Sequence, residues 1–151
     1  MSKNASLYCL LGLVLGLGIG YFYAQARAGR AATNAYATFK MTELGEASER
    51  AQQAYKHEII PVAIYAMSEL ADKLKAAEQT GTQYMSRQML SFDLMLAHAR
   101  LGKLYGQAGQ TNLNAEHVAE ALRYAKTGSN PAITNSAMLM DLVARIDKGA
   151  R

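Results

Sequence analysis

The sequence predicts an all-α protein in which one N-terminal transmembrane helix precedes a small helical domain. Three observations predict this fold class. The apolar residues are mostly Ala, Leu and Met, which favour helices, and the 151-residue chain holds only two prolines. Apolar residues recur at steps of three and four, and no segment alternates as a half-buried strand does. The length fits one domain. We expect residues 1–26 to form a membrane anchor or signal-anchor, residues 27–45 a helical extension or linker, and residues 46–151 the helical domain.

The N-terminal segment contains no charged residue between Lys3 and Arg27. Its core, Leu7 to Ala24, spans about 27 Å as a helix, close to the hydrocarbon thickness of a bilayer. Aromatic residues stand near both ends, as the headgroup interface favours. We therefore expect a single-pass membrane protein in contact with lipid. The short n-region lacks acidic residues, which favours a cytoplasmic N-terminus and an extracytoplasmic helical domain.

Two features of this segment lead to further hypotheses. The triplet Ala24-Gln25-Ala26 fits the cleavage site of a secretory signal, whose removal would yield a secreted protein. Gly12, Gly16 and Gly20 recur at a spacing of four, which places them on one helix face that another helix can approach closely. We expect these glycines to pack against a second membrane helix, either in a homodimer or in a larger complex.

Helical periodicity continues beyond the N-terminal segment, and glycine and proline mark the predicted breaks. Gly45 is the first predicted break, with Ser48 available as an N-cap. The helix that follows either ends before Pro61 or is kinked there, because proline disrupts a helix interior. The next helix ends near Gly81, a predicted C-cap. Its apolar face is formed by Ile60, Ile64, Met67, Leu70, Leu74 and Ala77.

Three further helices are predicted in the second half of the chain. The clearest has an apolar stripe from Leu90 to Ala108 and ends before Gly109. Another covers residues 114–126. In the last helix, Pro131 is predicted to lie near the start, where proline is tolerated.

The stretch within residues 95–128 resembles a single tetratricopeptide repeat. The positions that match the signature of that family are Leu101, Gly102, Tyr105 and Ala121. The sequence departs from the family at His98, where tryptophan is usual, and at Asn114, where a small alanine is usual. The resemblance implies stacked helical hairpins with a groove that binds peptide segments of partner proteins. The alternative is an ordinary helix–turn–helix with a Leu-Gly pair at a close crossing.

The sequence carries no pattern typical of a catalytic, metal or cofactor site. The 16 basic and 12 acidic residues are interspersed, whereas a nucleic-acid binder should concentrate its positive charge. Cys9 is the single cysteine, which excludes a disulfide within the chain and a cysteine zinc site. None of the three histidines has another His or Cys at metal-ligand spacing. We expect no cofactor, no nucleic acid and no small-molecule substrate.

These observations together predict a membrane-anchored, non-enzymatic helical adaptor that binds protein partners or itself. The alternative from a different class is an accessory subunit that its glycine-lined transmembrane helix holds in a membrane complex. A secreted helical protein, released by signal cleavage, is the third hypothesis.

Overall fold

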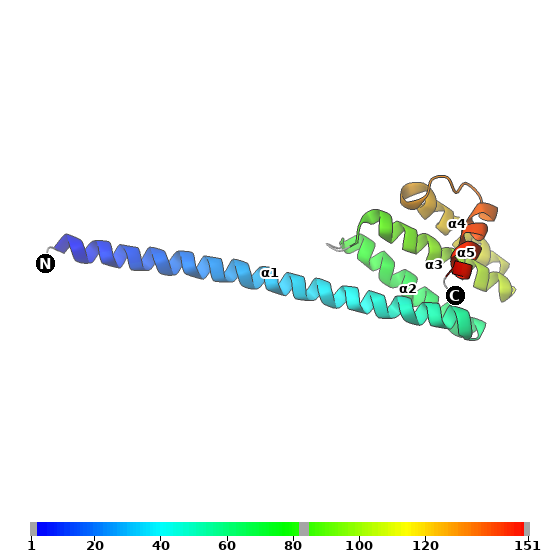
Figure 1. Cartoon of the computed structure of the whole chain (residues 1–151), viewed down its shortest axis with the longest axis horizontal. Coiled ribbons are helices and arrows are strands. Elements are labelled where there is room, and N and C mark those ends of the chain that lie inside the picture. Colours follow the sequence, from blue (N-terminus) through cyan, green and yellow to red (C-terminus); the bar gives the residue numbers. More distant parts are fainter. Residues whose placement is uncertain (1–2, 82–84, 150–151) are drawn as a thin grey trace. The chain divides into compact units, whose positions relative to one another are not determined.

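The computed structural model describes residues 3–81 and 85–149, with side chains described from residue 23 onward except at position 129. Within these residues every regular element is a helix, which confirms the all-α prediction (Figure 1). The elements are α1 (Lys3–His57), α2 (Ile60–Thr80), α3 (Arg87–Gln107), α4 (Thr111–Tyr124), the π-helix η1 (Ala125–Ser129) and α5 (Ser136–Gly149).

The prediction of an N-terminal transmembrane helix is wrong. Among the described residues, no helix has an apolar stretch of the length needed to cross a bilayer. The apolar N-terminal residues belong instead to α1, a 55-residue helix whose described side chains include Arg27, Arg30, Lys40 and Glu43. This finding overturns the predicted single-pass membrane localisation, together with the extracytoplasmic placement of the helical domain. Gly12, Gly16 and Gly20 are helical, and their packing lies outside the described side chains.

Helix α1 contributes to two units of the chain. Contacts divide the chain into residues 1–39 and residues 40–151. In the first unit, all side chains from residue 23 to residue 36 are exposed. The predicted break at Gly45 does not occur, and α1 continues to His57. In the second unit Ala47, Ala51 and Ala54 are buried, so this part of α1 belongs to the core.

Proline, glycine and serine residues mark several of the helix ends in the second unit. Pro61 occupies the first turn of α2, where its missing N–H costs no hydrogen bond. Gly81 ends α2 with a φ of +70°, as the predicted cap requires. The side-chain oxygen of Ser86 accepts a hydrogen bond from the Met89 backbone N–H and caps α3. Helix α5 begins five residues after Pro131, so the prediction that this proline lies inside the last helix is wrong.

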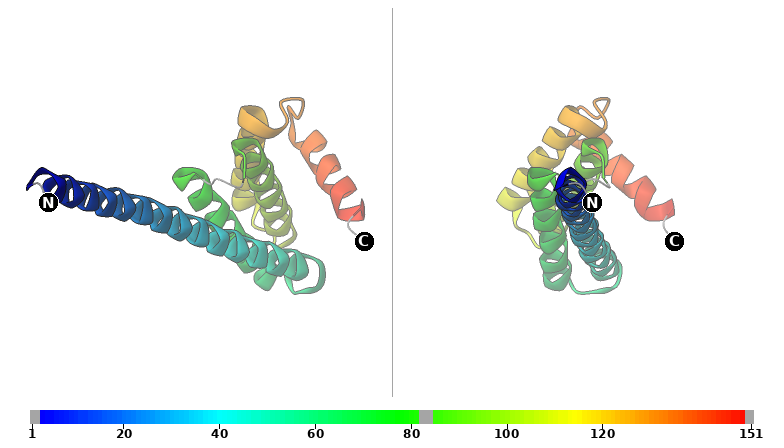
Figure 2. Two further views of the ribbon diagram at one scale, coloured as in Figure 1. Left: turned by 60° about the vertical axis from the view of Figure 1, so that its left-hand side comes forward. Right: turned by 90° about the vertical axis from the view of Figure 1, so that its left-hand side faces the viewer.

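Helix α3 is the centre of the second unit. It packs against α2, α4, η1 and α5, and Leu94, Met95 and Leu101 are almost completely buried. Figure 2 shows the chain leaving η1 through an irregular segment that leads into α5. Leu139 and Val143 are the buried side chains of α5. The core thus leaves α4 and α5 as an outer layer on α3.

Candidate functional site

The α3–α4 hairpin contains all four of the residues that carry the tetratricopeptide resemblance. Leu101, Gly102 and Ala121 are buried, and Tyr105 is half-buried. A Cβ atom at position 102 would stand 2.8 Å from Cγ2 of Val118 on α4. The absence of a side chain at Gly102 therefore allows the two helices to approach closely.

A side-chain hydrogen bond reinforces this close crossing. Nδ2 of Asn114 donates to the carbonyl oxygen of Gly102 at 2.7 Å. The same Nδ2 atom lies 2.9 Å from where a Cβ atom of Gly106 would stand. Asn114, which replaces the usual small residue of the resembled repeat, thus occupies space that two glycines of α3 leave open.

Four rings form a column between α3 and α4, in the order Tyr105, His117, His98 and Tyr124. The centroid distances along this aromatic column are 5.1, 5.2 and 5.8 Å, and each pair is stacked. Nδ1 of His98 lies 3.0 Å from Nδ1 of His117, so one neutral imidazole donates a hydrogen bond to the other. Sequence spacing alone did not reveal this pair, because its members are 19 residues apart and meet only across the hairpin.

Burial keeps both histidines of the column uncharged near neutral pH. Burial, together with the smaller effect of the positive charge of a protonated His117, lowers the pKa of His98 from 6.5 to about 4. The pKa of His117 is also lowered, again mainly by burial. Within the described residues, no group of three or more His, Cys, Asp or Glu side chains could hold a metal ion. The stacking of the rings and the contact between the two imidazoles favour a packing role for the pair.

A surface groove of about 880 Å³ lies between α3, α4 and α5. Aliphatic and small side chains form its apolar part, and amide, hydroxyl and ammonium groups complete it. The lining residues are Lys103, Gly106, Gln107, Asn114, Ala115, Val118, Ala119, Leu122, Asn135, Ser136 and Met140. We call this the α4–α5 groove. Ala115 and Ala119 are exposed, so their methyl groups are available for contact.

A network of polar side chains holds α5 in place beside the groove. Nε and Nη2 of the buried Arg100 donate to Oδ1 of Asp147 at 3.2 and 2.7 Å. The Tyr55 hydroxyl donates to Oδ2 of Asp147 at 2.9 Å and accepts a hydrogen bond from Lys103 at 2.9 Å. The network joins α1, α3 and α5, and it fixes one wall of the groove relative to α3.

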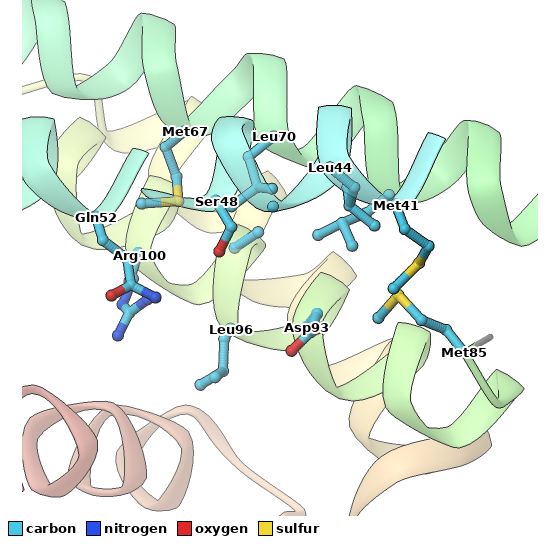
Figure 3. Close-up of a pocket in the computed structure, with 13 residues that line it drawn as sticks. Met41, Leu44, Ser48, Gln52, Met67, Leu70, Met85, Asp93, Leu96 and Arg100 are labelled. Atoms are coloured by element: carbon cyan, nitrogen blue, oxygen red, sulfur yellow. The ribbon is translucent and has the colours of Figure 1, made fainter. Parts of the chain in front are cut away.

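A second cavity lies between α1, α2 and α3 (Figure 3), and we call it the α1–α3 cleft. Its volume is about 230 Å³. Met41 and Met85 point toward one another at one end, and Gln52 and Arg100 lie at the other. Asp93 and Leu96 project from α3 on the same side of the cleft. Sequence periodicity does not indicate this cavity, since most of its lining residues come from three separate helices.

Comparison of the chain with protein-family models, curated proteins and solved structures finds no match.

Proposed function

We propose that the protein is a non-enzymatic helical adaptor that binds a segment of a partner protein in the α4–α5 groove. The observation that carries this proposal is the groove itself: an open apolar surface on an ordered helical frame. Val118, Leu122 and Met140 are only partly buried, so they retain apolar surface that a partner could cover.

The chemistry of the groove favours a peptide segment with aliphatic anchors. Ala115, Ala119 and Gly106 are small, which leaves room for the side chains of a partner. Gln107 and Ser136 provide hydrogen-bonding groups at the edge of the apolar strip. An apolar strip with polar groups at its border is the usual arrangement where a short amphipathic segment docks.

The resemblance of the hairpin to a tetratricopeptide repeat supports the same proposal, since that family binds peptide segments in grooves between helices. The close crossing at Gly102 and the Asn114 hydrogen bond hold α3 and α4 together. A rigid frame lowers the entropic cost of binding, because fewer groups are ordered when the partner arrives.

A site-specific photo-crosslinker tests the proposal. We would introduce benzoylphenylalanine at Ala119, which is exposed within the groove, and illuminate cells that express the full chain. The control places the same residue at Ala144, which is exposed on α5 and does not line the groove. Circular dichroism checks that both variants remain helical.

We expect a crosslinked product from position 119 but not from position 144. Mass spectrometry should map this product to one segment of a partner protein. Crosslinking to a second copy of this chain would show that the groove mediates self-association and does not bind a different partner protein. Equal products from both positions would contradict the proposal, because the groove would then have no preference over the rest of the surface.

A further inference from the structure

The α1–α3 cleft is lined mainly by flexible or branched apolar side chains. Met41, Leu44, Met67, Met85 and Leu96 contribute to its walls. Thioether side chains adapt to ligands of differing shape, because they are unbranched and have three rotatable bonds. At about 230 Å³ the cleft is smaller than the usual range for drug-sized ligands, which begins at roughly 300 Å³. Its ligand must therefore be small.

Asp93 is the distinguishing polar group of this cleft. Its side chain is half-buried, and in the described part of the chain it makes no hydrogen bond or ion pair. Desolvation by burial raises its pKa, and no neighbouring charge contributes to this shift. The carboxylate thus loses part of its hydration without receiving a protein partner in exchange.

The one basic residue of the cleft does not neutralise Asp93. Arg100 lines the far end of the cleft, and its Nε and Nη2 atoms both donate to Asp147. The other polar lining residues, Ser48 and Gln52, are uncharged. The net charge available to a ligand in the cleft is therefore negative.

From this combination we propose that the α1–α3 cleft binds a small amphipathic amine. The ammonium group of the ligand pairs with the Asp93 carboxylate, and its apolar body lies among the methionine and leucine side chains. A neutral ligand of the same shape gains only the apolar contacts, and an anionic ligand is repelled by Asp93.

Methyl spectroscopy of the full chain, with ¹³C-labelled methionine methyl groups, tests this site. The probes are n-hexylamine, 1-hexanol and hexanoate, which share a six-carbon body and differ in charge. We expect n-hexylamine to shift the methyl signals of Met41, Met67 and Met85 saturably at pH 7.5. Its affinity should be at least about tenfold higher than that of hexanol, and hexanoate should not compete.

Two variants and one control separate the effect of the Asp93 charge from the effect of the shape of the cleft. Asp93→Asn should remove the preference for the amine and leave the hexanol affinity within about twofold. Asp141→Asn, which changes an exposed aspartate of α5 outside the cleft, should preserve the preference. Gly45→Leu adds a side chain to the cleft wall at a position with nothing within 4 Å of the new Cβ atom. This variant should weaken amine and alcohol alike.

Three outcomes would overturn the proposal. The first is an absence of saturable shifts with n-hexylamine, and the second is saturable shifts confined to other methionines. The third is an amine preference that survives Asp93→Asn, which would show that this carboxylate does not select the ligand.

Discussion

Replacement of Asp147 by alanine should strongly destabilise the second unit. Asp147 accepts two hydrogen bonds from Arg100 and one from Tyr55. Its side chain is 18% exposed and that of Arg100 is 10% exposed. The substitution leaves the Arg100 guanidinium buried without a counter-charge, and the Tyr55 ring, 5.2 Å away, replaces only part of the interaction.

The magnitude follows from the burial of the pair. Removal of one partner from a buried ion pair costs about 3–5 kcal/mol, and the partial exposure of Asp147 places this case at about 2–3 kcal/mol. For a unit of this size, such a loss corresponds to a decrease in Tm of roughly 10 °C.

Helix α5 itself provides the matched control. Asp141 pairs with Arg145 at 3.1 Å, but these side chains are 67% and 70% exposed. Asp141→Ala should therefore change the free energy of unfolding by less than about 0.5 kcal/mol. Urea unfolding followed by circular dichroism measures both variants. Hydrogen exchange should also show faster exchange of the α5 amides in Asp147→Ala alone, because the network holds this helix on α3.

Similar losses of stability in the two variants would contradict the prediction, since burial of the Arg100–Asp147 pair would then not govern its contribution to stability. The double variant Arg100→Met/Asp147→Ala provides a second check. If it lost as much stability as Asp147→Ala alone, the prediction would also be contradicted. In that double variant no buried charge remains, and part of the stability should return.

Two further predictions concern pH and packing. The folded pKa of His98, about 4, lies below its ordinary value of 6.5, so the stability that its neutral form provides is complete above pH 6.5 and is lost as the pH falls towards 4. Thermal unfolding between pH 7 and pH 4 should show this slope, and His98→Gln should reduce it. Gly102→Ala should cost about 1–3 kcal/mol in urea unfolding, because the new Cβ meets Val118 at 2.8 Å. Gly45→Ala, whose Cβ meets nothing within 4 Å, should instead stabilise by up to about 1 kcal/mol.

The all-α class could be predicted from the sequence because helix periodicity and helix breakers are local signals. The ends of α2 illustrate this, since Pro61 lies in the first turn of the helix and Gly81 is its C-cap. At Gly45 the local signal was misleading, because the glycine predicted a helix break and α1 continues through it. The cost of one glycine is at most about 1 kcal/mol, and the burial of Ala47 and Ala51 outweighs it.

The prediction of a transmembrane helix at the N-terminus was also wrong. The apolar run of 18 residues is part of one helix that continues through Arg27 and Arg30 to His57, and among the described residues no helix has an apolar stretch long enough to cross a bilayer. The candidate sites depend on contacts between distant residues, which composition and spacing do not reveal. His98 meets His117 across the hairpin, and the aspartate of the α1–α3 cleft faces side chains from two other helices.

The most direct test of the adaptor proposal is the affinity of the crosslinked partner segment, as a synthetic peptide, for three forms of the full chain. We expect Ala119→Arg, which places a long charged side chain in the α4–α5 groove, to raise the Kd measured by calorimetry at least about tenfold. Ala144→Arg, on the exposed surface of α5, should leave the Kd of the unmodified chain unchanged. An equal Kd for all three proteins would contradict binding in the groove.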